Sequence, residues 1–134
     1  MIARAESRCE YCRSPDRYAP DPFPIDHVQP QSRGGVDRLS NLAYARAGCN
    51  GRKYTATEAR DPATGELAPL YHPRQHRWTD HFARSDDEAL VVGRTATGRA
   101  TIARLQLTRP RLVALRGLLR AVGEHPPVER PPAG

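Results

Sequence analysis

The sequence predicts an α+β fold, and three patterns along the chain support this. Residues 23–60 read as strand, loop, strand and helix, with short apolar runs separated by Gly and Pro. Residues 79–93 have the pattern of two strands around an acidic turn. Residues 97–122 are typical of two successive helices. We therefore expect a strand-loop-strand-helix unit followed by an extension of one hairpin and two helices.

Length and composition predict one domain, or a small domain with an appendage. The chain has 134 residues, of which 38% are hydrophobic and only 6% aromatic. Such a composition supports a modest core, so a metal site would help to stabilise the fold. The 13 prolines and 10 glycines indicate many turns between short elements.

The charge of the chain indicates a polyanionic partner. Lys and Arg together number 21 against 15 acidic residues, which gives a net charge of +6. Lys53 is the only lysine, and the planar guanidinium of arginine suits phosphate recognition. Nucleic acid is thus the expected partner. The alternative is a high-GC genome that encodes arginine in place of lysine.

The three cysteines predict metal ligation and not a disulfide framework. They are odd in number, and the chain has neither an apolar signal segment nor a stretch long enough to span a membrane. We expect a cytoplasmic protein, in which thiols stay reduced and available to a metal.

The first elements surround the polar residues of the sequence. Residues 23–28 alternate apolar side chains and predict a short strand that ends in polar residues. Residues 29–37 contain a Pro and a Gly-Gly pair and predict a loop. Residues 39–45 are a candidate second strand or turn. Residues 50–60 contain no Pro and stop before Asp-Pro, which predicts a helix.

The middle of the chain predicts extended structure. Residues 67–73 are expected to be extended because prolines disfavour helix in the residues before them. Residues 74–78 are expected to form one helical turn. Residues 79–84 and 89–93 are expected to form two strands around the acidic turn at 85–88.

Two helices and a tail complete the chain. Residues 97–107 predict the first helix, and Thr108 is the expected N-cap of a second helix over 109–122. Gly123 is its expected stop, and the proline-rich residues 125–134 are expected to be a loose tail. The apolar residues expected to face inward are Ile102, Leu105, Leu107, Leu112, Leu115, Leu118, Leu119 and Val122.

The polar residues between the first strand and the helix can serve phosphodiester hydrolysis. His27 is a candidate base because histidine ordinarily titrates near neutral pH, and Asp26 offers a hard oxygen ligand for Mg²⁺. Neighbours on a strand point to opposite sides, so both can face one phosphate only if the strand kinks or ends there. Asn50 can offer a second oxygen, and Asn41 can hydrogen-bond across the Gly-Gly loop.

The fixed spacings of this segment resemble those of HNH endonucleases, which have the ββα-metal (His-Me finger) nuclease fold. The resemblance covers roughly residues 9–53. The matching positions are Cys9-x2-Cys12, Asp26-His27-x2-Pro30-x-Ser32-x-Gly34-Gly35, Asn41-Leu42 and Cys49-Asn50-x2-Lys53.

The resemblance implies a metal-dependent DNA endonuclease whose products carry 5′-phosphates. By position, Asp26 and Asn50 would hold Mg²⁺ or Mn²⁺, His27 would be the general base and Asn41 would orient the base loop. The alternatives are a non-catalytic nucleic-acid-binding zinc-knuckle module and an RNA-directed nuclease. The basic residues expected to contact nucleic acid are Arg33, Arg46, Arg52 and Lys53.

One position departs from the pattern and concerns structural zinc. The family has a further cysteine three residues before Cys49, and this chain has Arg46 there. Zinc would therefore be weakly bound or absent at Cys9, Cys12 and Cys49. Its fourth ligand would be a water or a histidine, with His72 and His76 as the nearest candidates, or Arg46 would hydrogen-bond the thiolates instead.

The rest of the chain carries a weaker resemblance and sets the expected boundaries. Residues 69–82 and 96–102 are similar to a longer bacterial HNH subfamily, with no role assigned to that region. We expect a nuclease core over 1–62, an α+β extension packed on it over 63–124, and a proline-rich tail over 125–134.

Overall fold

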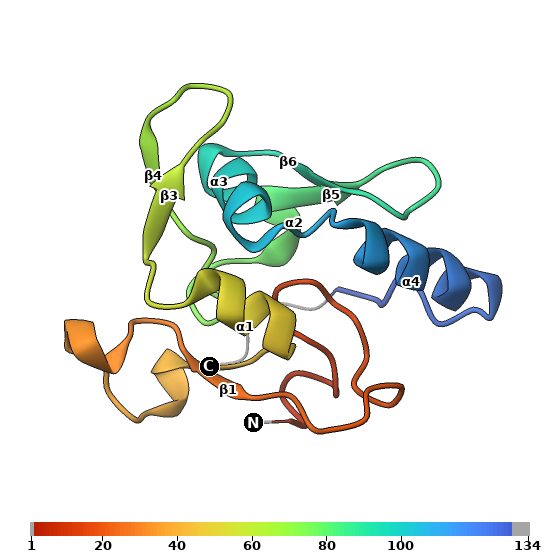
Figure 1. Cartoon of the computed structure of the whole chain (residues 1–134), viewed down its shortest axis with the longest axis horizontal. Helices are drawn as coiled ribbons and strands as arrows, with labels where there is room; N and C mark the ends of the chain where they lie inside the picture. Colours follow the sequence, from red (N-terminus) through yellow and green to blue (C-terminus); the bar gives the residue numbers. More distant parts are fainter. Residues whose placement is uncertain (1, 130–134) are drawn as a thin grey trace.

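The computed structural model describes residues 2–129. In this part of the chain, three two-stranded antiparallel sheets alternate with four α-helices, as Figure 1 shows. The bounds in chain order are β1 Ile25–His27, β2 Leu42–Tyr44, α1 Ala47–Lys53, β3 Glu58–Arg60, β4 Leu67–Pro69, α2 Trp78–His81, β5 Phe82–Arg84, β6 Val91–Gly93, α3 Ala96–Leu105 and α4 Pro110–Ala121. The mixed α/β content that the sequence predicts is confirmed.

The first hairpin pairs β1 with β2, and its connection contains two short 3₁₀ turns. In the register, Asp26 lies opposite Ala43 and His27 opposite Leu42. The connection turns at Gly34, whose φ of +86° lies in the left-handed region that glycine tolerates. A side chain at Gly35 would overlap the carbonyl of Gln29, so the backbone of the loop folds closely on itself.

Helix α1 corrects the predicted helix over 50–60. It spans Ala47–Lys53 and stops because Tyr54 adopts a φ of +51°, which a regular helix cannot contain. Residues 58–60 instead form β3, which pairs with β4. The absence of Pro from 50–60 was compatible with either structure, and pairing with a distant strand decided between them.

The second half contains the predicted hairpin and helices with shifted bounds. The predicted strand over 79–84 is correct only from Phe82, because residues 79–81 belong to α2. The helical turn expected at 74–78 is replaced by a turn between His72 and His76, and α2 begins at Trp78. Gly98 of α3 lies so close to the carbonyl of His81 that no side chain would fit there.

Helix α4 departs from the predicted apolar stripe. Leu112 and Leu119 are buried, but Leu118 and Val122 are 70% and 68% exposed. Arg116 is 2% exposed and donates hydrogen bonds to the carbonyls of Ala89 (3.1 Å) and Cys12 (3.5 Å). A long side chain with buried methylenes and two paired terminal nitrogens thus replaces aliphatic packing on this face. The N-cap of α4 is Arg109, one residue after the predicted Thr108.

The start of the predicted loose tail is anchored. His125 is buried, and its Nε2 lies 2.7 Å from the carbonyl oxygen of Glu88. Glu129 forms ion pairs with Arg13 at 2.9 Å and with Arg84 at 3.6 Å. The prediction is therefore wrong for residues 125–129, and residues 130–134 lie outside the described residues.

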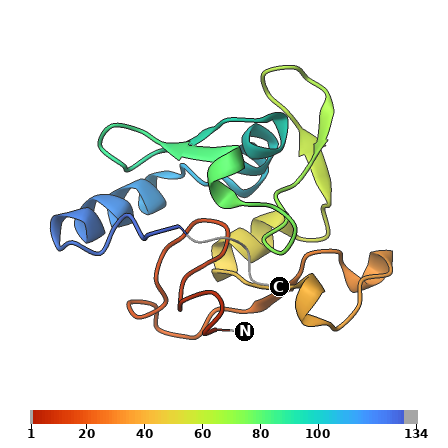
Figure 2. The same cartoon turned by 180° about the vertical axis from the view of Figure 1, so that it is seen from behind.

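The two halves of the chain meet around α1. The N-terminal segment and the β1–β2 hairpin lie on one side of α1, and α2 and α3 lie on the other, as both views show (Figures 1 and 2). Helix α1 contacts α3, and α3 also contacts β3, β4 and β6. The buried cysteines belong to the same core cluster as the residues of the second half, among them Tyr71, Trp78, Phe82, Leu105 and Leu112.

A buried aspartate closes the β3–β4 hairpin and predicts acid sensitivity. Asp61 is 0% exposed and accepts hydrogen bonds from Arg99 Nε (2.9 Å) and Nη2 (2.8 Å). The Arg99 guanidinium holds the pKa of Asp61 well below its usual range, with burial acting in the opposite direction. This stabilisation is fully present above the unfolded-state pKa of about 4 and is lost as pH falls towards the folded-state pKa.

We expect Asp61→Asn to lower stability at neutral pH and to weaken its pH dependence below pH 4. Urea unfolding midpoints measured from acidic to neutral pH should converge for the two proteins as pH falls. Asp86→Asn, at an exposed aspartate, is the matched control and should follow the wild type. Parallel curves for wild type and Asp61→Asn would contradict the assignment.

Candidate active site and metal centre

Strand β1 places Asp26 and His27 on opposite sides. Both residues stay in the regular ladder with β2, so no kink turns them towards one side. Asp26 is buried at 4% exposure, and the His27 side chain is 28% exposed. Asp26 and His27 are therefore adjacent in the chain, but the pleat of β1 directs their side chains to opposite sides.

Asp26 is paired inside the protein. Tyr11 Oη donates a hydrogen bond to its Oδ2 at 2.7 Å, and Lys53 Nζ lies 3.4 Å from Oδ1 and 3.3 Å from Oδ2. Burial raises the pKa of Asp26, and the nearby Lys53 and Tyr11 oppose that rise. The buried carboxyl group thus has a cation and a hydroxyl beside it, as buried acidic groups in proteins usually require.

Lys53 is a buried partner of the hairpin and does not form the surface contact to nucleic acid that the sequence predicted. It is 1% exposed, and its ammonium also donates to the carbonyls of Val28 (3.0 Å) and His27 (3.5 Å). Burial lowers the pKa of Lys53, whereas Asp26 raises it. The ion pair and hydrogen bonds of Lys53 therefore join the last turn of α1 to the end of β1.

The oxygen ligands expected around Asp26 suit a hard divalent cation, but the ammonium of Lys53 occupies the same place. Asn50 precedes Lys53 by three residues on α1, so the two share a helix face, and Lys53 directs that face towards Asp26. Carboxylate and amide oxygens are the ligands that Mg²⁺ and Mn²⁺ prefer. The Lys53 ammonium and such an ion would compete for the same carboxylate.

His27 is oriented by a residue that the sequence did not single out. Its Nε2 lies 2.5 Å from Asp37 Oδ1, and Gln31 Nε2 donates to the same oxygen at 3.1 Å. The Asp37 side chain is 74% exposed, so this pair sits at the surface. The sequence feature that could have indicated Asp37 was its position two residues after the Gly-Gly turn, in the loop that follows His27.

Asn41 braces the loop between the two strands. Its Oδ1 accepts from the amide of Gln29 at 2.8 Å, and its Nδ2 donates to the carbonyls of Gln29 (3.0 Å) and Val36 (2.9 Å). Asn41 is 7% exposed, so these bonds are shielded from water. The hydrogen bonds across the Gly-Gly loop fix the residues that follow His27.

The three cysteines form one buried cluster. Cys9, Cys12 and Cys49 are 0–1% exposed, and their Sγ atoms all lie within 4.8 Å of one another. This arrangement fits three corners of a tetrahedral thiolate site, such as zinc prefers. No histidine of the described residues joins the cluster, and His72 and His76 instead contact each other, with the His72 amide donating to His76 Nδ1 at 2.9 Å. The predicted histidine ligand is wrong.

The three thiols of the cluster differ in pKa. Burial raises the pKa of Cys9, and hydrogen bonds with the other two cysteines act in the same direction. The hydrogen bond to Cys12, together with burial, raises the pKa of Cys49 to about 12, although the bond to Cys9 acts against it. Burial alone would raise the pKa of Cys12 as well, but hydrogen bonds from Cys49, Cys9 and Ser14 hold it well below its usual value. Cys12 is thus the cysteine that carries a thiolate most readily.

Arginine contacts the cysteine cluster, although not as the sequence predicted. Arg46 Nε donates to Ser14 Oγ at 2.9 Å, and Ser14 Oγ lies 3.0 Å from Cys12 Sγ. The direct contact comes from Arg109, whose Nη2 donates to Cys49 Sγ at 3.6 Å. A residue sixty positions away therefore takes the thiol-binding role expected of Arg46.

We expect Arg46→Cys to raise both the zinc content and the melting temperature. Residue 46 is the N-cap of α1, three residues before the buried Cys49, and a cysteine there would restore the fourth thiolate of the family pattern. Structural zinc contributes directly to folding, far more than the one hydrogen bond lost. Elemental analysis after chelator treatment and thermal melts would test this. One zinc per chain retained by the wild type after chelation would contradict a weak natural site.

Residues 73–82, to which the resemblance assigned no role, contact the cysteine knuckle, which is the turn from Cys9 to Cys12. Arg74 forms an ion pair with Glu10, which also accepts a bond from the Tyr44 amide. Trp78 Nε1 donates to the carbonyl of Tyr11 at 3.3 Å. Because Tyr11 in turn bonds Asp26, the second half of the chain supports the inner side of the candidate site.

Of the basic residues predicted to contact nucleic acid, Arg33 and Arg52 are exposed. Arg46 is half-buried, with its guanidinium 5.3 Å from the ring centroid of Phe23. The surface candidates are therefore Arg33, in the loop after β1, and Arg52 on α1.

These features define a small mixed α/β domain with a candidate metal centre. They are a hairpin with a partly exposed histidine, a helix joined to that hairpin by a buried ion pair, and a cysteine cluster. Residues 9–56 match the model of the HNH family, described as HNH endonuclease. This match confirms the resemblance seen in the sequence and indicates a nuclease-type function on nucleic acid. No curated protein and no solved structure matches the chain.

Among residues 2–129, no helix is long and apolar enough to cross a membrane.

Proposed function

We propose that the chain is a metal-dependent DNA endonuclease with a ββα-metal core. The observation that carries the proposal is the arrangement of β1, β2 and α1. It leaves His27 partly exposed beside a loop braced by Asn41, while Lys53 pairs with Asp26 and Asn50 precedes Lys53 by three residues on the same helix. Residues 1–62 would form the nuclease unit and residues 63–124 its supporting extension.

In this mechanism His27 removes a proton from the attacking water. The water oxygen bonds to phosphorus as the bond from phosphorus to the 3′ oxygen breaks, which leaves a 5′-phosphate. Asp37 orients the imidazole through the 2.5 Å contact, and Asn41 fixes the loop that carries Asp37. A divalent ion held by Asp26 and Asn50 would neutralise charge on the phosphate and on the departing oxygen. This step requires Lys53 to move aside and β1 to turn Asp26 towards the phosphate that His27 faces, because the two side chains lie on opposite sides of the strand.

The exposed arginines would bind the nucleic-acid backbone. Arg33 and Arg52 flank the hairpin and the helix that carry the site, where contacts to phosphate oxygens position a duplex without reading its sequence. Such binding weakens steeply as salt concentration rises.

One observation favours a second candidate, a non-catalytic nucleic-acid-binding module. The Asp26 carboxylate already has a cation beside it, the ammonium of Lys53 at 3.3 Å. If that pair never opens, the domain keeps its basic surface and lacks a place for the ion.

Incubation with supercoiled plasmid, with and without Mg²⁺ or Mn²⁺, distinguishes these functions. The endonuclease predicts relaxed or linear DNA only when a divalent ion is present. Binding without cleavage under every condition would favour the non-catalytic module. Single-stranded RNA of matched length is the parallel substrate, and cleavage of RNA alone would replace DNA as the target.

A further inference from the structure

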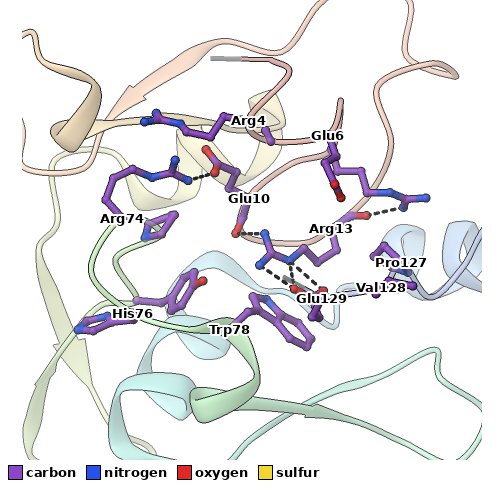
Figure 3. A pocket seen from close by; sticks show the side chains of 14 residues that line it. Arg4, Glu6, Glu10, Arg13, Arg74, His76, Trp78, Pro127, Val128 and Glu129 are labelled. Carbon is purple, nitrogen blue, oxygen red and sulfur yellow. Dashed lines mark hydrogen bonds and ion pairs between the residues drawn. The ribbon is translucent and has the colours of Figure 1, made fainter. Parts of the chain in front are cut away.

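A polar cavity lies beside the segment around Cys9 and Cys12, with Glu10 and Arg13 in its wall. It has a volume of about 180 Å³ and is lined by the N-terminal segment, the stretch between Tyr71 and Trp78, and residues 127–129. Figure 3 shows that arginine and glutamate side chains, with His76 and Trp78, form its walls. The mechanism proposed above uses none of these groups.

Arg74 is the feature of this cavity that needs an explanation. Its side chain is only 6% exposed, and one terminal nitrogen, Nη2, pairs with Glu10. Its other two nitrogens, Nε and Nη1, are buried and have no hydrogen-bond partner within the described residues. Leaving the donors of a buried charged group unsatisfied is unfavourable, so this geometry indicates a place for an acceptor.

The charges around Arg74 favour an anion as that acceptor. Burial first, and then the positive charge of Arg4, lowers the pKa of Arg74 to about 10, so the guanidinium remains charged at neutral pH. The three carboxylates of the cavity wall already have positive neighbours: Glu10 binds Arg74 Nη2 and also the Tyr44 amide, Glu129 binds Arg13, and Glu6 acts on Arg8, whose pKa burial lowers and Glu6 raises. An oxyanion would reduce the repulsion between Arg4 and Arg74.

The size of the cavity limits the ligand to a small one. A volume of about 180 Å³ corresponds to roughly six water molecules. Pockets for drug-sized ligands start at about 300 Å³, so a nucleoside would not fit inside. Tyr71 and Trp78 are 2% and 3% exposed and offer no free ring face for a base.

We propose that this cavity is a binding site for a single phosphate group, with the buried guanidinium of Arg74 as its hydrogen-bond donor and Arg4 as its second positive charge. A guanidinium N–H without a partner donates a charge-assisted hydrogen bond to a phosphate oxygen. Two sources could supply the group: inorganic phosphate, or the 5′-phosphate end of a nucleic acid. The second source rests on the proposed function.

Titration with inorganic phosphate, followed by the ¹H–¹⁵N signal of the arginine Nε groups, tests the site directly. We expect a saturable shift of the Arg74 Nε signal and a rise in melting temperature, neither of which appears with sodium chloride at matched ionic strength. Arg74→Met should weaken phosphate binding by about tenfold or more, as the loss of charged hydrogen bonds predicts. Arg111→Met, at an exposed arginine of α4, is the matched control.

The results of these titrations test the phosphate site independently of the proposed endonuclease function. An unshifted Arg74 signal, or equal effects of phosphate and chloride, overturns the site even if the Arg74 variant fails to fold, because both measurements use the wild type. If phosphate binds, oligonucleotides with and without a 5′-phosphate, compared in the presence of EDTA, identify the source. Tighter binding of the phosphorylated strand assigns it to nucleic acid, and equal binding assigns it to free phosphate. Absence of plasmid cleavage would leave this result unchanged.

Discussion

His27→Ala should reduce plasmid cleavage by about 10²- to 10⁴-fold, the usual contribution of a positioned general base. The imidazole lies on the exposed side of β1, where it can reach a water molecule beside a bound phosphate. Initial rates on supercoiled plasmid in the presence of Mn²⁺ would measure the loss.

The matched control for this variant is Asp37→Asn. It keeps the imidazole and replaces the carboxylate 2.5 Å away with an amide, so cleavage should fall by much less than in His27→Ala. Both variants should fold as well as the wild type, because a surface pair of this kind contributes only about 0–1 kcal/mol. Equal cleavage by wild type and His27→Ala would show that His27 is not the base.

Lys53→Met should lower the free energy of unfolding by about 3–5 kcal/mol, the usual effect of removing one partner from a buried ion pair. The variant leaves Asp26 at 4% exposure with Tyr11 as its remaining partner, and it removes the bond to Val28. Urea unfolding in the presence of EDTA would measure the change. Stability within about 1 kcal/mol of the wild type would contradict the role of the pair.

The same variant tests whether Asp26 is a metal ligand. If the ammonium competes with a divalent ion, Mn²⁺ should raise the unfolding midpoint of Lys53→Met by more than it raises that of the wild type. The double variant Asp26→Asn/Lys53→Met is the control, since it has neither buried charge and should recover much of the lost stability. An equal Mn²⁺ response in the single and double variants would remove Asp26 from the metal site.

The sequence alone indicated the family and the strand-loop-strand part of the domain, because these depend on local spacing. The Gly-Gly turn, the alternation before Asp26 and the Asn41 position all act over a few residues of chain. Helix α1 was predicted with the wrong end, since residues 58–60 form a strand only by pairing with residues 67–69. A propensity read from one segment contains no information about such a partner.

Tertiary structure decided what each polar residue contacts. The sequence predicted that Asp26 and His27 would point to opposite sides of the strand, but only the fold decided that Asp26 faces inward and His27 outward. Long side chains from distant elements then completed the inner site: Lys53 reached Asp26, and Arg109 reached Cys49. Burial and charge pairing are properties of three-dimensional neighbours, so the sequence supplied the chemical groups and the fold determined which of them meet.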